Sequence, residues 1–207
     1  MSEIYEPNLE RMYTYLRGRL DGAGWDQSIR ALAYARKAHE GQFREGSGAP
    51  YIIHPISMAC DAIACKGATD NLIAVILLHD VVEDCNKDLS ALPVNEIVRN
   101  GVRYMTVEPL LTEDKEQAEQ RYFPELLLSP EAIICKAFDR NANLNDMYDF
   151  NKDRIIKNVI ETHVQLMPIL KEAKYLYPEY SDMLHTIRTS LKRTVRLLAH
   201  QYDIKLE

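Results

Sequence analysis

Apolar residues recur at near-helical spacing along most of this chain, as on the buried face of an α-helix. Period-two alternation, which indicates strands, is confined to doubtful runs near residues 104–107. Short loops interrupt the apolar stretches, and GQFREGSGAPY at 41–51 is one of them. Helices are therefore predicted from His54-Pro55 to Gly67, from Ser129-Pro130-Glu131 onward, and over residues 28–37, 71–84, 90–102, 153–175 and 178–202.

These elements predict an all-α fold, and the 207 residues without repeats or linkers predict one domain over 1–207. Thr69 or Asp70 is expected to cap the helix at 71–84. Residues 103–128 are the least readable part, because they hold Pro109, Pro124 and the charge-rich TEDKEQAEQR. That segment predicts either a solvated helix or a mobile loop.

The helix at 71–84 is apolar nearly all round until His79, which predicts a position in the middle of the domain. The stretch LLHDVVEDC then places four ionisable side chains at its end. Residues four apart share a helix face, so His79 and Glu83 would point one way. Asp80 and Asp84 would lie about 100° round from them. These residues either mark the exposed end of a buried helix or are ligands delivered to a metal ion.

Two residues elsewhere favour the metal. His54 begins a helix directly after the glycine-rich loop, where a ligand can be aimed inward. Asp139 is embedded in the apolar pattern of ICKAFDRNANL. A buried carboxylate is costly unless a cation, a set of donors or a metal compensates it. Arg140, the next residue, or a capping amide is the alternative partner for Asp139.

Composition and charge narrow the partners. The net charge is −6 without a block of Lys or Arg, which argues against nucleic acid. A small anionic substrate is still compatible with this net charge, because a metal ion and one or two cationic side chains can make the electrostatic potential of a pocket positive. No apolar run approaches the roughly 20 residues that span a membrane, and the N-terminus does not resemble a signal peptide. We therefore expect a cytoplasmic protein without membrane contact.

The cysteines and two charged segments add little chemistry. Cysteines 60, 65, 85 and 135 form no CxxC pair and are expected to be reduced and buried. Helix 178–202 carries a basic stripe, and residues 113–119 are acidic; both are interpreted as solvated faces, with a homo-oligomer interface as the alternative. The stripe consists of Arg188, Lys192, Arg193 and Arg196.

Three blocks of sequence together resemble the hydrolase domain of the RelA/SpoT alarmone enzymes, which are HD-type metal-dependent phosphohydrolases. The blocks are HEGQFREGSGAPYIIHP at 39–55, LIAVILLHDVVEDC at 72–85 and ICKAFDRNANLNDM at 134–147. The family carries approximately HxGQxR…PYxxHP, LLHDVVEDT and KxADRxxN in the same order. The similarity covers about residues 28–150, and the length resembles the stand-alone small alarmone hydrolases. The resemblance implies a single HD-domain helical bundle around a metal site, completed by C-terminal helices over 153–202.

The resemblance also assigns roles by position. It implies that Mn²⁺, or another divalent ion, is bound by His54, His79, Asp80 and Asp139. It implies that the acidic pair, Glu83 and Asp84, acts on the attacking water. It places four residues near the substrate: Arg44, Asn143, Lys136 and Arg140. The alternative for Lys136 and Arg140 is a structural role.

The implied activity is metal-dependent hydrolysis of the 3′-pyrophosphate of ppGpp or pppGpp, which gives GDP or GTP and pyrophosphate. A bound metal lowers the pKa of water, and a nearby carboxylate can move its proton. One alternative is an HD phosphohydrolase for another nucleotide, such as an adenine alarmone or a nicotinamide nucleotide phosphate. Another is a non-enzymatic regulatory module. Glu45 after Arg44, and Asn141-Ala142 in the third block, depart from the family and bear on the substrate more than on the metal.

Overall fold

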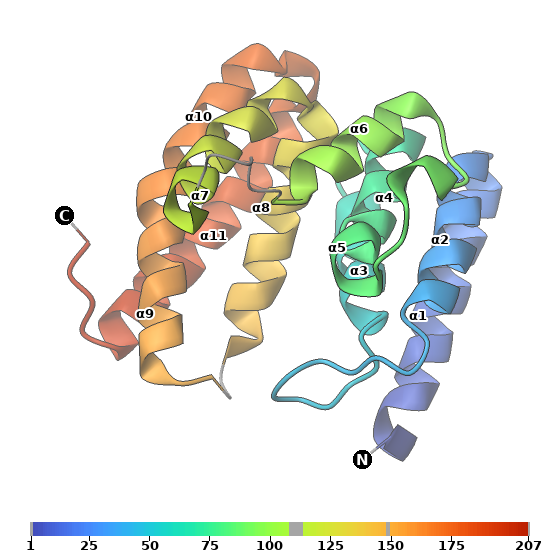
Figure 1. The fold of residues 1–207 in the computed structure, drawn as a ribbon, viewed down its shortest axis with the longest axis horizontal. Coiled ribbons are helices and arrows are strands. Elements are labelled where there is room, and N and C mark those ends of the chain that lie inside the picture. The colour runs from blue at the N-terminus through green and yellow to red at the C-terminus, as the bar shows by residue number, and fades with distance from the viewer. Residues whose placement is uncertain (1, 108–113, 148–149, 207) are drawn as a thin grey trace. The chain divides into compact units, whose positions relative to one another are not determined.

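The structure, a computed structural model, describes residues 2–107, 114–147 and 150–206 (Figure 1). The chain divides into two compact units, Met1–Thr106 and Val107–Glu207, and each is described by itself below. The described residues form helices and an isolated bridge between Phe43 and Pro50, without a β-strand. The all-α prediction is therefore confirmed, whereas the single domain stays a prediction.

The first unit is built around one apolar helix. Its helices are α1 (Ser2–Ala23), α2 (Asp26–Ala38), α3 (Ile53–Ile63), α4 (Asp70–Leu78), α5 (Val81–Cys85) and α6 (Glu96–Met105), with a 3₁₀ turn at Leu89–Ala91. Helix α4 packs against α2, α3 and α6, and residues 72–78 are all buried. Thr69 caps α4 by accepting a hydrogen bond from the amide of Leu72 at 3.2 Å. The central position predicted for this helix is confirmed.

The predicted helix at 71–84 is wrong in one respect, because the chain breaks at His79-Asp80 into α4 and α5. An unbroken helix would offer the carbonyl of Ile76 to the amide of Asp80. The ring Nδ1 of His79 lies 2.9 Å from that carbonyl and competes for it. Asp80 has φ −98° and ψ −5°, between helix and turn geometry. The break means that residues 79 and 83 do not share one straight helix face.

Two other predicted boundaries are also wrong. Helix α3 ends at Ile63 rather than continuing to Gly67, whose φ of 92° belongs to the following turn. The helix predicted at 90–102 begins at Glu96 and continues to Met105, past the buried Gly101. Asn95 caps it by accepting a hydrogen bond from the amide of Val98 at 3.0 Å. The side-chain cap, rather than the apolar pattern alone, sets where this helix begins.

The second unit has α8 at its centre. Its elements are α7 (Lys115–Glu125), α8 (Pro130–Asn145), α9 (Lys152–Glu161), a π-helical turn at Thr162–Leu166 (η4), α10 (Met167–Leu176) and α11 (Ser181–Gln201), with 3₁₀ turns at Leu126–Leu128 and Pro178–Tyr180. Helix α8 packs against α9, α10 and α11. Ser129 caps α8, as predicted, by accepting from the amide of Ala132 at 3.2 Å. The long pattern at 153–175 becomes α9, the π-helical turn and α10.

The charge-rich segment resolves in favour of a helix from Lys115 onward, begun by a capping box between Asp114 and Gln117. The start of that segment, at 112–113, lies outside the described residues.

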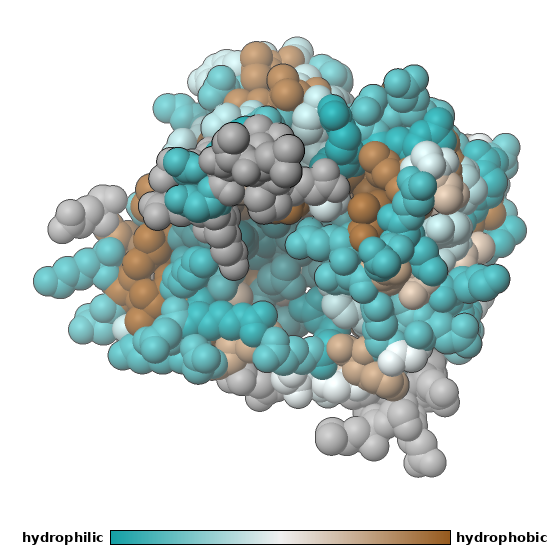
Figure 2. All heavy atoms as spheres, in the orientation of Figure 1, coloured by the Kyte–Doolittle hydropathy of each residue, from teal (hydrophilic) through white to brown (hydrophobic). Residues whose placement is uncertain are grey.

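All four cysteines are free, as expected, but only Cys135 is fully buried. No helix among the described residues is both long and apolar enough to cross a membrane. The face in Figure 2 is mostly hydrophilic with separate hydrophobic patches. Tyr175 and Leu197 are among the exposed large hydrophobic side chains of the described residues.

Candidate metal centre

The end of helix α4 fixes His79 and Asp80 in the first unit. The seven apolar residues before His79 are buried, so the backbone that carries both side chains is held by the core. The side chain of His79 is 1% exposed and that of Asp80 is 22% exposed. The anchored helix and its charged end are therefore parts of one arrangement, and the two interpretations of LLHDVVEDC are compatible.

His54 joins this pair from the first turn of α3. Its Nε2 lies 4.0 Å from Oδ2 of Asp80, and Nε2 of His79 lies 2.9 Å from the same oxygen. One ligand atom from each of the three residues lies within 4.8 Å of the others. Two imidazole nitrogens and a carboxylate oxygen at this separation can converge on a single divalent ion. The structure thus brings together three of the four predicted ligands.

The ring of His79 is oriented for ligation. Its Nδ1 lies 2.9 Å from the backbone carbonyl of Ile76, which only accepts hydrogen bonds. Nδ1 therefore carries the proton of the neutral ring, and the lone pair is on Nε2, beside Asp80. Metal-binding histidines are commonly oriented by such a carbonyl contact. The donor set and this tautomer fit a divalent metal ion.

Tyr51 also contacts the cluster, and the sequence reasoning did not single it out. Its hydroxyl donates to Oδ2 of Asp80 at 2.6 Å. Burial, and then the neighbouring charge of Asp80, raise the pKa of the Tyr51 phenol, so the hydroxyl stays protonated and donates at neutral pH. The signal was present in the first block, because Tyr51 precedes His54 by three residues at the entrance to α3.

The acidic pair lies on α5, where Glu83 and Asp84 are both exposed. Gln42 reaches this helix from the glycine-rich loop and donates from Nε2 to the backbone carbonyl of Asp84 at 3.1 Å. The other end of its amide, Oε1, lies 2.7 Å from Nδ1 of His39. The buried ring of His39 stacks on Tyr51 with centroids 4.7 Å apart. Gln42 and His39 therefore connect the acidic helix α5 to Tyr51, which contacts the cluster.

Arg44 lies in the same loop, which is closed by a hydrogen bond from its amide to the carbonyl of Ala49 at 2.8 Å. Its guanidinium carbon lies 5.9 Å from the centroid of the Tyr51 ring. Since the hydroxyl of that ring contacts Asp80, Arg44 is one side chain removed from the histidine cluster. The first unit therefore gathers a ligand cluster, an acidic pair and a cation.

The other predicted site residues lie on α8 in the second unit. The carboxylate of Asp139 is buried, with Oδ2 3.1 Å from Nζ of Lys136 and Oδ1 accepting from Nδ2 of Asn143 at 2.6 Å. Arg140, considered above as its partner, instead donates to Asn158 and Glu161. Burial lowers the pKa of Lys136, but electrostatic interactions with Tyr122 and with the Asp139 carboxylate outweigh it and raise the pKa overall.

Comparison with known proteins identifies the family. The HD domain matches residues 31–162, which is more than half of the chain. The chain belongs to the HD-domain family. The motif-bearing residues at 54, 79–80 and 139 all lie inside that match.

Relatives of this HD domain are named after guanosine polyphosphates. The chain is 31% identical over 146 residues to the bifunctional (p)ppGpp synthase/hydrolase SpoT of Escherichia coli strain K12, a match that covers 66% of this chain and 20% of that protein. It is 34% identical over 145 residues to the guanosine-3′,5′-bis(diphosphate) 3′-pyrophosphohydrolase of Vibrio cholerae, covering 64% of this chain and 20% of that protein. The chain thus spans about a fifth of the length of these curated relatives.

A solved structure shares the fold. It superimposes with a TM-score of 0.63 at 19% identity and covers 86% of this chain and 97% of its own. That structure is described as a metazoan ortholog of SpoT that hydrolyzes ppGpp and plays a role in starvation responses. At this identity the likeness supports the all-α fold assignment.

Proposed function

We propose that this chain is a metal-dependent hydrolase that removes the 3′-pyrophosphate of ppGpp or pppGpp and leaves GDP or GTP. The observation that carries the proposal is the convergence of His54, His79 and Asp80 within 4.8 Å in a chain of the HD-domain family. The names of the relatives supply the nucleotide. A phosphohydrolase needs a cation beside its phosphates, and Arg44 is placed within the same unit as the cluster.

The metal would be held by these three residues, with Asp139 as the fourth ligand that the resemblance adds. Mn²⁺ is our first choice, because mixed nitrogen and oxygen donors without thiolate suit it. When bound, a divalent ion supplies Lewis acidity toward a phosphoryl oxygen and lowers the pKa of a water molecule. The half-buried carboxylate of Asp80 provides the negative charge that two neutral imidazoles lack.

The residues of this chain then divide the remaining work. The acidic pair at 83–84 is exposed at the end of α5, where a carboxylate can accept the proton of the attacking water. Arg44 would neutralise charge on the phosphoryl oxygens with its planar guanidinium. Asn143, Lys136 and Arg140 are proposed as substrate contacts, with the Lys136–Asp139 and Arg140–Glu161 pairs as the observations that favour structural roles for the two cations.

The test is hydrolysis of ppGpp by the purified full chain after treatment with a chelator, with and without added Mn²⁺. We expect GDP and pyrophosphate in equal amounts, released only when metal is present, with products separated by anion exchange. Metal-independent release would contradict the site. Absence of pyrophosphate from ppGpp, together with turnover of an adenine alarmone or NADPH, would move the proposal to the other nucleotide. No turnover of any of these would favour a regulatory module.

The compartment and partners are proposed with the activity. Free cysteines at all four positions fit a reducing cytoplasm, where the nucleotide would be the small-molecule partner. The prediction that the chain binds neither nucleic acid nor membrane, and the open question of a homo-oligomer, stay predictions. Gel filtration with light scattering addresses the last one directly.

A further inference from the structure

The second unit contains a pocket that the proposed hydrolase reaction does not use. It has a volume of about 550 Å³ and lies between α10, α11 and the π-helical turn. Its lining contains none of the residues assigned above to the metal, the water or the nucleotide substrate. Pockets of roughly 300–1,000 Å³ are the size that encloses small organic ligands. The pocket is therefore large enough for a molecule rather than a single ion.

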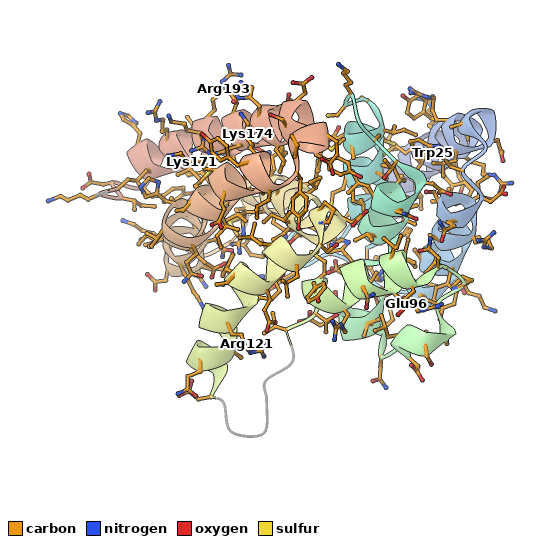
Figure 3. All side chains as sticks on the ribbon, turned by 90° about the horizontal axis from the view of Figure 1, so that it is seen from above. Trp25, Glu96, Arg121, Lys171, Lys174 and Arg193 are labelled. Atoms are coloured by element: carbon orange, nitrogen blue, oxygen red, sulfur yellow. The ribbon has the colours of Figure 1, made fainter. Side chains whose placement is uncertain are left out.

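Cations from two helices surround this pocket. Lys171 comes from α10, and α11 adds Arg188, Lys192 and Arg196, which follow one another at intervals of four residues. Like charges four apart on a helix repel each other by about 0.2–0.5 kcal/mol per pair. The arrangement therefore carries an electrostatic cost that a bound anion would remove. Figure 3 labels Lys171 together with two cations that do not line the pocket, Lys174 on α10 and Arg193 on α11. Lys174 and Arg193 add further positive charge to these two helices.

Within the described part of the chain, these charges have no acidic partner. Among the residues that the structure describes, no carboxylate oxygen lies within 4.0 Å of the charged nitrogens of the four pocket cations. Arg188 directs one N–H, at Nε, toward the backbone carbonyl of Met167 at 3.4 Å. The net charge of the chain is −6, so this local excess of positive charge runs against the overall balance. The pocket is built to attract a compact polyanion.

Apart from His163, the remaining walls of the pocket are apolar. Met167 and Pro168 at the start of α10, Val195 on α11 and Leu206 all line the pocket. The π-helical turn before α10 brings in His163, and such turns frequently occur at functional sites. Inorganic phosphate would leave these apolar walls uncovered. A ligand that fits both features carries phosphate groups at one end and a planar or apolar group at the other.

We propose that this pocket binds a nucleoside polyphosphate at a second, non-catalytic site. The phosphates would contact the cations of α10 and α11, with the arginines able to form paired hydrogen bonds to them. The nucleoside would lie against Met167, Pro168 and Val195. This inference concerns binding in the second unit, and it can be tested whether or not the chain hydrolyses ppGpp.

The test follows the methyl group of Met167 by NMR in full-length protein with ¹³C-labelled methionine methyl groups, assigned with Met167→Leu. GTP and inorganic tripolyphosphate are the two probes. We expect GTP to shift the Met167 signal with saturation, and tripolyphosphate to bind at least about fivefold more weakly because it cannot cover the apolar walls. Equal affinities for the two probes would overturn the assignment of a nucleoside.

Charge-reversal variants locate the binding. Lys192→Glu with Arg196→Glu should weaken GTP binding by about tenfold or more, because two charge-assisted contacts are lost. Arg193→Glu is the matched control for the single variant Lys192→Glu, since it reverses one charge on an exposed residue of α11 that does not line the pocket. It should change the affinity less than about twofold. An equal loss in the control, or no shift of Met167 with GTP, would overturn the proposal. Circular dichroism confirms that the variants are folded.

Discussion

Two aspartates of the candidate site lie in contrasting surroundings. Asp80 is at a break between helices, with a partly exposed side chain beside two histidines and the hydroxyl of Tyr51. Asp139 is inside the continuous helix α8, with a side chain that is 9% exposed and a lysine 3.1 Å away. Both are acids in apolar sequence, but one is surrounded by metal-type donors and the other by a compensating cation.

The difference teaches that burial alone does not mark a ligand. The charge of Asp139 is already balanced by Lys136 and by the amide of Asn143, so the carboxylate is compatible with the fold without any ion. Asp80 lies near two imidazoles and accepts from Tyr51, and its carboxylate and the two rings form a donor set of the kind that binds a divalent ion. Loss of Asp80 should therefore damage chemistry, and loss of Asp139 should damage stability as well. Substitutions in both units test this contrast.

Asp80→Asn is expected to have the largest effect. Removing the only charged donor of the described cluster should lower the rate of ppGpp hydrolysis by roughly a thousandfold, the scale of metal-ion catalysis. Because asparagine still accepts from Tyr51, the melting temperature should change by only about 2 °C. Rates come from pyrophosphate release, and Asp61→Asn on the exposed face of α3 is the control. Retained activity would show that the site is assigned wrongly.

Asp139→Asn should cost about 3 kcal/mol of unfolding free energy, because it leaves Lys136, whose side chain is only 16% exposed, without its carboxylate. The double variant with Lys136→Met should recover most of that loss in urea denaturation. Isothermal titration with Mn²⁺ separates the two roles: the resemblance predicts weaker binding in both the single and the double variant. Unchanged Mn²⁺ affinity in the stable double variant would limit Asp139 to a structural role.

The sequence predicted the residues of this contrast but not their different surroundings, because it assigned both aspartates to the metal, and the misses have local causes. The apolar run before His79 correctly placed the histidine at the end of a central helix. The break after it was missed because it depends on the His79 ring competing for the carbonyl of Ile76, a side-chain contact that no apolar pattern reports. Tyr51 was missed because an aromatic residue before a helix is ordinarily interpreted as packing.

The partner of Asp139, by contrast, was predictable from helix geometry. Residues three and four apart share a face, which selects Lys136 and Asn143 rather than the adjacent Arg140. Which side chains from separate segments meet, as Tyr51, His54 and Asp80 do, depends on tertiary packing, and only the family resemblance hinted at it. The predicted helix boundaries were wrong near Ile63 and Glu96, because caps and turns outweigh apolar periodicity at these positions.

The caps of the two central helices extend the comparison to smaller energies. Thr69→Ala removes one hydrogen bond from the start of α4 and should cost about 1 kcal/mol. Ser129→Ala should cost about 2 kcal/mol, because the Ser129 hydroxyl also donates to the buried carboxylate of Glu131 at 3.0 Å. Urea denaturation measures both. Equal losses would mean that Glu131 finds another donor, and that buried acids in the second unit depend less on single partners than Asp139 suggests.

Gln42→Ala should act only on the chemistry near Asp80, with an effect no larger than that of Thr69→Ala on stability. Its amide links His39 to the backbone of Asp84, so its loss should loosen α5 without removing any ligand. We expect kcat for ppGpp to fall about fivefold with KM unchanged, which corresponds to about 1 kcal/mol. Phe43→Ala, at the exposed neighbouring position of the same loop, is the matched control. A rise in KM with kcat unchanged would instead place Gln42 against the substrate and remove its role in positioning the acidic pair.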